Sequence, residues 1–262
     1  MSAEGPVLFD VEGGVATITI NRPEARNALN MEVKRGLGAA VAEAGACADV
    51  RALVLTGAGG AFCAGGDIGE MVLNDSPVTS RARLAWLLDE VVIPLAELEK
   101  PTIAAVEGHA HGAGLSLALA CDLMVVAEDA LLSCAFAGMG LVPDCGALYF
   151  LPRRLPMGIA KDLVLTGRRI CGAEAGEMQL ASRVTSPGTA LMTARELAST
   201  LAGAATVALG LSKKLLEAAT TSTLREMAEL EAFGQSVAYA SEDHRAAREA
   251  FAAKVRPIFT GR

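Results

Sequence analysis

Short apolar segments alternate with longer helical segments along the first half of the chain, and this alternation limits the folds open to it. The segments typical of strands are residues 15–20, 51–56, 102–106, 123–127 and 131–134. Helical spacing of apolar residues covers residues 27–46, 81–100 and 113–120. Strands that alternate with helices predict an α/β fold with crossover connections.

The second half of the chain differs, because helical patterns dominate after about residue 159. With 262 residues and a hydrophobic content of 52%, the chain is long enough for one substantial core. We therefore expect a single core over residues 1–195 and a C-terminal helical region over residues 196–262.

Composition narrows the classes of partner. The formal net charge is −7, so the chain has no global attraction for nucleic acid or for an anionic membrane. The longest strongly apolar run, residues 113–121, is too short to cross a bilayer. The first six residues lack the basic and apolar segments that are typical of a signal peptide.

The six cysteines, at positions 47, 63, 121, 134, 145 and 171, form no C-x-x-C pair and are irregularly spaced. In a chain of this size such a pattern indicates reduced, buried thiols, and neither a disulfide framework nor a zinc site. We therefore expect a cytoplasmic protein.

Glycine clusters follow two of the predicted strands, at residues 57–66 and 108–114. A dinucleotide-binding loop would need the pattern G-x-G-x-x-G, but Phe62 and Leu117 occupy the position of the third glycine. Bare backbone amides at such turns suit an oxyanion, whereas glycines of an ordinary tight turn need no ligand at all. From glycine content alone, both interpretations stay open.

Longer segments carry a more specific resemblance. They are residues 21–30 (NRPEARNALN), 54–68 (VLTGAGGAFCAGGDI), 100–122 (KPTIAAVEGHAHGAGLSLALACD), 140–153 (GLVPDCGALYFLPR), 165–175 (LTGRRICGAEA) and 241–262 (SEDHRAAREAFAAKVRPIFTGR). In this order they resemble the enoyl-CoA hydratase/isomerase, or crotonase, superfamily, and most closely its single-aspartate isomerases. The resemblance implies an α/β crotonase (ClpP-like) spiral of ββα units with a C-terminal helical trimerisation region.

The same resemblance implies a ligand and an assembly. The substrate would be an acyl-CoA thioester, with coenzyme A as part of the substrate and no other cofactor or metal, and the chain would form a homotrimer or a dimer of trimers. The backbone amides of Gly66 and Ala113 would form an oxyanion hole. The residues implied to bind coenzyme A are Arg26, Ala28, Ala64, Asp67, Ile68 and Lys254.

Proton-carrying residues separate the reactions of this superfamily. Its hydratases use two glutamates, whose positions fall on Ser116 and Phe136 here, so a two-glutamate hydratase is not expected. Asp144, in the segment G-L-V-P-D, matches the aspartate of the isomerases. One carboxylate can carry a proton from the α-carbon of a 3-enoyl thioester to the γ-carbon and give the 2-enoyl product. The sequence therefore predicts a Δ3–Δ2 enoyl-CoA isomerase.

Alternative interpretations accompany this prediction. The chain could catalyse another reaction of the superfamily, such as hydration through an atypical acid, or bind acyl-CoA without catalysis. Asp144 could cap the helix that follows it, as aspartate often does. Asp67 and Asp122 are expected to stabilise a loop and a helix end, respectively.

Three other signals point to different chemistry. His109 and His111 form an H-x-H pair, but no third metal ligand is evident beside them. Ser116 lies in G-A-G-L-S, which is not the nucleophile motif G-x-S-x-G. Cys145 adjoins Asp144, and without a cationic neighbour we expect a buried, unreactive thiol.

Overall fold

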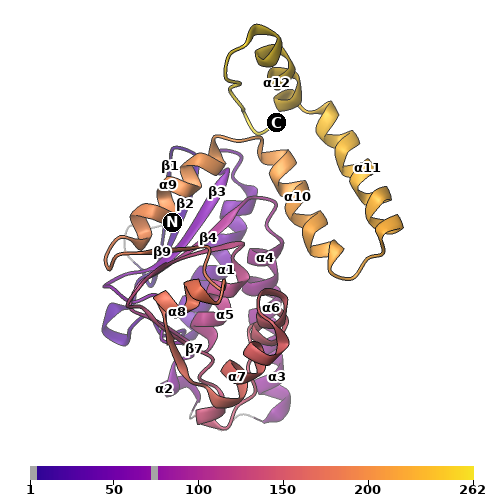
Figure 1. Cartoon of the computed structure of the whole chain (residues 1–262). Coiled ribbons are helices and arrows are strands. Elements are labelled where there is room, and N and C mark those ends of the chain that lie inside the picture. Colours follow the sequence, from indigo (N-terminus) through magenta and orange to yellow (C-terminus); the bar gives the residue numbers. More distant parts are fainter. Residues whose placement is uncertain (1–4, 72–75) are drawn as a thin grey trace.

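The computed structural model describes residues 5–71 and 76–262. Within those residues, six strands form one sheet in the order β1-β2-β3-β4-β6-β9, parallel except for the β1–β2 hairpin. The strands are β1 (Val7–Glu12), β2 (Val15–Ile20), β3 (Ala52–Gly57), β4 (Thr102–Val106), β6 (Leu123–Ala127) and β9 (Arg183–Thr185). The predicted α/β fold is confirmed (Figure 1).

A smaller layer lies beyond the C-terminal ends of these strands. Its strands are β5 (His109–His111), β7 (Leu131–Ser133) and β8 (Arg169–Cys171). Two extended segments continue the layer through the isolated bridges Cys63↔Ala110 and Leu29↔Gly66. Successive turns of the chain therefore place one strand in the large sheet, one extended segment in the small layer and then a helix, which is the spiral that the sequence predicted.

Helices cover both faces of the large sheet. On one face lie α1 (Met31–Ala46) and α5 (Ala113–Ala120), within the larger hydrophobic core. On the other face lies α9 (Ala190–Ala202), whose stripe of alanines at every fourth position is fully buried against β3, β4 and β6. Small side chains let this helix approach the sheet closely, and the large sheet is therefore buried on both sides.

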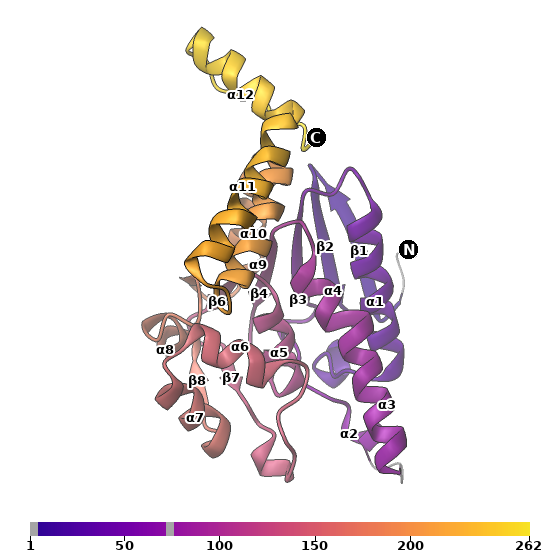
Figure 2. The ribbon, with the colours of Figure 1, turned by 90° about the vertical axis from the view of Figure 1, so that its right-hand side faces the viewer.

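The predicted domain boundary at residue 195 falls inside α9. Because α9 packs on the sheet along its whole length, it belongs physically to the core, and the chain leaves the core only after Ala202. The helices that follow are α10 (Thr206–Ala219), α11 (Leu224–Ala240) and α12 (Glu242–Ala253). Figure 1 shows α11 and α12 projecting from the body of the molecule, and in Figure 2 α12 extends beyond the rest of the chain.

Polar contacts attach this helical region to the core. On α10, Lys213 forms an ion pair of 3.0 Å with Asp122, at the end of α5. The guanidinium of Arg51, just before β3, donates to the carbonyls of Ala204 and Phe259, so the C-terminal tail returns to the core. The structural role expected for Asp122 is confirmed, because its carboxylate also accepts a hydrogen bond of 2.7 Å from the amide of Thr102.

Several predicted boundaries are wrong. The helix predicted at 27–46 begins at Met31, because Asn30 caps it and the buried Asn27 side chain donates to the first glycine loop instead. The helix predicted at 81–100 is three pieces, namely α3 (Pro77–Leu87), a π-helical turn η2 (Leu88–Val92) and α4 (Ile93–Glu97). The region after residue 159 contains β8 and β9, beside the helices α7 (Met157–Thr166) and α8 (Gly172–Glu177). None of the described helices is long and apolar enough to span a bilayer.

Candidate active site

The first glycine loop leads from β3 into an extended segment of the small layer. Hydrogen bonds fix its register on both sides. On one side, the amide of Cys63 donates to the carbonyl of His109 at 2.8 Å, and the carbonyl of Cys63 accepts a hydrogen bond from the amide of His111 at 3.0 Å. On the opposite side, the amide of Ala64 donates to the carbonyl of Arg26 at 2.9 Å. The segment is thus a short parallel strand between two neighbours.

An extra residue interrupts this strand at Gly65. In a regular strand, every second amide points to the same neighbour. Here the amide of Ala64 points to the segment 26–29, and the next one to do so is that of Asp67, three residues later. Gly65, at φ +100°, accommodates the extra residue as a bulge does. As a result, the amide of Gly66 donates to no group in residues 5–71 and 76–262.

The second glycine loop supplies another free amide beside the first. Gly112, at φ +52°, turns the chain from β5 into α5, and Ala113 is the first residue of that helix. Amides of a first helical turn have no acceptor within the helix. A methyl group on Gly65 would lie 3.7 Å from the Ala113 nitrogen, and one on Gly114 only 2.3 Å from the Cys63 carbonyl oxygen. The two loops are therefore in direct contact, and the two predicted oxyanion-hole residues lie together.

Asp144 lies on the loop between the short 3₁₀ turn η3 (Ala137–Met139) and α6 (Ala147–Arg154). Its carboxylate oxygen Oδ1 is buried and has no hydrogen-bond partner in the described part of the chain. Gly146 is the N-cap of α6, and no side chain caps that helix. The interpretation of Asp144 as a helix cap is therefore wrong.

The surroundings of Asp144 favour its neutral form. Burial is the largest effect and raises the pKa of the carboxyl above its usual range, against smaller opposing effects of the Cys145 thiol and the Lys34 ammonium. Burial also raises the pKa of the Cys145 thiol, so the expectation of an unreactive thiol agrees with the structure. A carboxyl whose pKa lies closer to neutrality is better suited to accept a proton and release it again.

Of the two positions where the resemblance places the hydratase glutamates, Ser116 contacts Asp144 and Phe136 lies beside Gly112. Ser116 is fully buried, and its hydroxyl reaches the carbonyl oxygens of Gly112 at 3.2 Å and Asp144 at 3.0 Å. The ring of Phe136 lies 3.7 Å from where a side chain on Gly112 would begin. The turn that carries Ala113 therefore lies in one cluster with Ser116, Phe136 and Asp144, and Asp144 is the carboxylate among them.

Most residues predicted to bind coenzyme A also lie together. The exposed side chains of Arg26 and Ile68 flank the partly exposed Ala28, Ala64 and Asp67, all within the segments that pair through Leu29↔Gly66. Lys254 does not join them, because it ends α12 in the projecting helical region (Figure 1). Within one chain, the predicted coenzyme A site therefore lacks this lysine.

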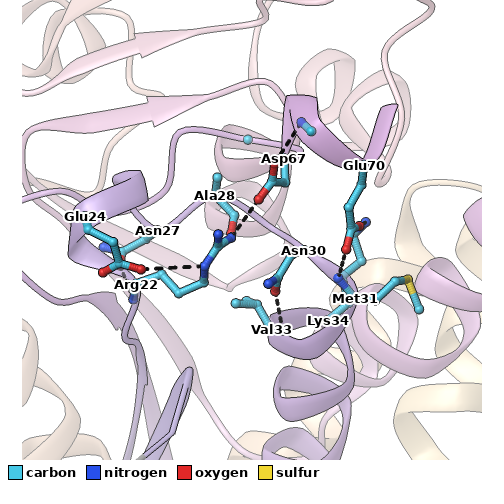
Figure 3. A network of polar contacts seen from close by, with 12 residues as sticks. Arg22, Glu24, Asn27, Ala28, Asn30, Met31, Val33, Lys34, Asp67 and Glu70 are labelled. Atoms are coloured by element: carbon cyan, nitrogen blue, oxygen red, sulfur yellow. Dashed lines mark hydrogen bonds and ion pairs between the residues drawn. The ribbon is translucent and has the colours of Figure 1, made fainter. Parts of the chain in front are cut away.

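Asp67 is engaged in the protein itself. Its Oδ2 accepts a hydrogen bond of 2.9 Å from Arg22, and its Oδ1 accepts one of 2.9 Å from the amide of Gly69 (Figure 3). The Arg22 hydrogen bond is the main cause that lowers the pKa of this carboxyl. The predicted loop-stabilising role is confirmed, while contact with coenzyme A stays a prediction.

A second pair of residues, which sequence analysis missed, holds the helix that follows Asp67. Glu70, on α2 (Ile68–Met71), accepts a hydrogen bond of 2.7 Å from the amide of Met31 and forms an ion pair of 3.3 Å with Lys34 (Figure 3). Glu70 therefore fixes α2 on the first turn of α1. Its distance of 36 positions from Lys34 left no local signal in the sequence.

The histidine pair is not part of a described metal centre. The rings of His109 and His111 lie 5.3 Å apart, and the His111 ring nitrogen Nδ1 is 2.8 Å from the Ser133 hydroxyl. In the described residues, no three His, Cys, Asp or Glu side chains are placed to hold a metal ion. Burial, followed by the influence of His109, lowers the pKa of His111 to about 4, so its imidazole is neutral at physiological pH.

Comparison with known proteins identifies the family of this chain. The family model described as Enoyl-CoA hydratase/isomerase matches residues 10–262. The chain belongs to the enoyl-CoA hydratase/isomerase family. The predicted membership of this superfamily is thereby confirmed, and so is the predicted crotonase-type spiral fold.

Relatives of this enoyl-CoA hydratase/isomerase family member differ in their named reactions. It is 38% identical over 260 residues to the 1,2-epoxyphenylacetyl-CoA isomerase of Escherichia coli (strain K12), with 98% of each chain covered. It is 35% identical over 251 residues to the short-chain-enoyl-CoA hydratase of Clostridium acetobutylicum, with 95% of each covered. The crystal structure of an enoyl-CoA hydratase from Polaromonas sp. JS666 superposes with a TM-score of 0.92 at 32% identity, covering 97% of this chain and 99% of that one. The family is settled by these matches, and the reaction within it is not.

Proposed function

We propose that this protein is a Δ3–Δ2 enoyl-CoA isomerase that uses Asp144 as its only acid/base. The observation that carries the proposal is the buried Oδ1 of Asp144, in the same cluster as the amides of Gly66 and Ala113; none of the three has a hydrogen-bond partner among residues 5–71 and 76–262. The absence of carboxylates at Ser116 and Phe136 supports a reaction that needs one proton carrier instead of two.

The proposed reaction moves one proton between two carbons of the acyl chain. The thioester oxygen of a 3-enoyl-CoA accepts hydrogen bonds from the amides of Gly66 and Ala113. Asp144 removes a proton from C2, and the electron pair of the broken C–H bond spreads over a dienolate whose oxygen the two amides stabilise. The protonated carboxyl then returns the proton to C4, and the double bond lies between C2 and C3.

Hydration of a 2-enoyl-CoA is the second candidate, because a hydratase is among the relatives. It would require Asp144 to orient a water molecule and also deliver a proton, without help from Ser116 or Phe136. The name of the Escherichia coli relative suggests a third kind of substrate, an epoxide of phenylacetyl-CoA.

One coupled assay separates these candidates. The purified protein is offered 3-enoyl-CoA and 2-enoyl-CoA series of several chain lengths and 1,2-epoxyphenylacetyl-CoA. We expect conversion of 3-enoyl to 2-enoyl thioesters. Hydration of 2-enoyl-CoA at a higher kcat/KM than isomerisation would reject the isomerase, and binding of acetoacetyl-CoA in calorimetry without turnover of any substrate would favour the non-catalytic binder.

The projecting helices support the predicted trimer or dimer of trimers. They expose large apolar side chains, and α10 and α11 enclose a groove of about 720 Å³ lined mainly by apolar residues. The exposed apolar side chains include Leu216, Leu224, Phe233 and Phe251. Exposed apolar area of this kind is typical of a subunit interface. A monomer mass in light scattering at micromolar concentration would reject the assembly.

A further inference from the structure

Asp144 has two close polar neighbours that the proposed reaction leaves without a role. Ser116 contacts its backbone, and Cys145 is the next residue in the chain. Both side chains are buried, with exposed fractions of 0% and 2%. Polar groups in such places need hydrogen-bond partners, and the Ser116 hydroxyl has its acceptors in the carbonyls of Gly112 and Asp144.

The Ser116 hydroxyl is not required to satisfy the carbonyl groups that it reaches. The carbonyl of Gly112 already accepts the amide of Ser116 at 3.1 Å, and the carbonyl of Asp144 already accepts the amide of Ala147 at 3.1 Å. The single hydroxyl hydrogen is shared between the two oxygens, at 3.2 and 3.0 Å. Its effect is to connect the turn before the Ala113 amide to the loop that carries Asp144.

Cys145 is held in a backbone conformation that side chains disfavour. Its φ of +50° lies in the left-handed region, which costs about 1–2 kcal/mol for a residue other than glycine. The thiol is free and buried, and it stays protonated at neutral pH because burial raises its pKa. A protonated thiol can donate to one oxygen of the neighbouring Asp144 carboxylate, which leaves the other oxygen to exchange a proton with the substrate. Backbone strain of this kind is most often retained at functional sites.

We propose, on the basis of the isomerase function above, that Ser116 and Cys145 are positioning residues for Asp144. The hydroxyl fixes the backbone of the acid at a set distance from the oxyanion turn, and the thiol fixes the direction of its carboxylate. A proton carrier that serves two carbons must reach both from one position, so small displacements lower the rate.

The Ser116 half is tested with Ser116→Ala and the matched variant Thr56→Val. Thr56 is also buried, and its hydroxyl donates to the carbonyl of Ala105 at 3.1 Å, away from Asp144. We expect kcat of Ser116→Ala to fall about tenfold with KM changed less than twofold, while Thr56→Val lowers only Tm. Equal kcat values for the two variants would reject a positioning role for Ser116.

The Cys145 half is tested with Cys145→Ala, which removes the donor, and Cys145→Ser, which keeps one. Because a hydrogen bond to the charged form lowers the pKa of a carboxyl, its loss raises that pKa. The ascending limb of the kcat/KM profile of Cys145→Ala should therefore move to higher pH, and Cys145→Ser should restore it. An unshifted limb in Cys145→Ala would reject the role of the thiol.

A second measurement separates this proposal from the isomerase proposal. The carboxyl ¹³C signal of Asp144, assigned with Asp144→Asn, reports the pKa of that group without turnover. A shifted titration in Cys145→Ala together with normal isomerisation by Asp144→Asn would retain the thiol contact and reject the function. The same titration in Cys145→Ala and in the unmodified protein would reject the thiol contact, whatever the activity.

Discussion

The two carboxylates of the site region, Asp67 and Asp144, lie in opposite environments. Both oxygens of Asp67 accept hydrogen bonds, and its pKa is lowered mainly by Arg22. Asp144 has a buried oxygen without a hydrogen-bond partner among the described residues, and burial raises the pKa of its carboxyl. The first environment fixes a loop, whereas the second leaves a carboxyl free to change its protonation state. Groups that stabilise charge need to be rigid, and a group that transfers a proton needs an unoccupied oxygen.

The largest expected effect comes from Asp144→Asn. The amide cannot accept the C2 proton, so isomerase kcat should fall by at least ~10²–10⁴-fold, the usual contribution of an acid/base group. The same change removes a buried charge with an unpartnered oxygen, so Tm at pH 7 should rise or stay unchanged. Steady-state kinetics and thermal unfolding of one preparation test both statements.

Asp67→Asn is the matched comparison, because it weakens an engaged carboxylate in the same region. It should lower Tm more than Asp144→Asn does and kcat much less. If Asp144→Asn isomerised the substrate at the normal rate, Asp144 would have no part in the reaction, and the contrast between the two carboxylates would lose its functional meaning.

The next largest effect concerns the bulge at Gly65. An added methyl group would lie 2.7 Å from the His111 carbonyl oxygen, and the φ of +100° disfavours any side chain. Gly65→Ala should therefore displace the Gly66 amide and lower kcat by about 10²–10³-fold, the usual cost of losing one oxyanion donor. Binding of acetoacetyl-CoA in calorimetry should weaken as well, because its enolate uses the same amides.

Gly60→Ala provides the control for this prediction. Gly60 lies in the same loop at φ +75°, but no atom lies within 4 Å of an added methyl group. This variant carries the backbone strain without the contact, so Tm should fall while kcat stays within about twofold. Similar losses of kcat in Gly60→Ala and Gly65→Ala would show that loop strain, and not the position of the Gly66 amide, determines the rate.

Much of the core could be predicted because its signals are local. The short apolar runs at β2, β3, β4 and β6 each identify a buried strand by themselves. The missed strands, β1 and β9, lie at the two edges of the sheet and include charged residues, so neither has a continuous apolar run. Glu107 accepts hydrogen bonds from the amides of Gly188 and Ala190 and so holds the start of α9, a contact between distant segments that no local signal predicts.

The site could be predicted only in part, for a similar reason. Matching motifs identified Gly66, Ala113 and Asp144, which the structure brings into one cluster. No motif indicates that Oδ1 of Asp144 lacks a partner in the described part of the chain, because that depends on which groups of distant segments surround it. The contact between Ser116 and Asp144, 28 positions apart, likewise exists only after the second glycine loop and the acid loop pack together.

The smallest expected effect concerns His111, a titratable residue at the end of β5, next to the second glycine loop. Its imidazole is half-buried near Arg169 and Arg26, and its pKa in the folded protein is about 4, against 6.5 for the unperturbed group. The unfolded chain therefore binds a proton below about pH 6.5 that the folded protein binds only near pH 4. Stability is unaffected above that window and is lost as the pH falls through it, by on the order of 1 kcal/mol after allowance for solvent screening.

Urea unfolding of His111→Gln should show less loss of stability between pH 6.5 and 4. His244→Gln, which alters an imidazole packed on Tyr239 outside the core, should keep the loss seen in the unmodified protein. Equal pH dependence of stability in His111→Gln and the unmodified protein would mean that protonation of His111 does not destabilise the fold, and that the loss of stability in acid arises from other residues.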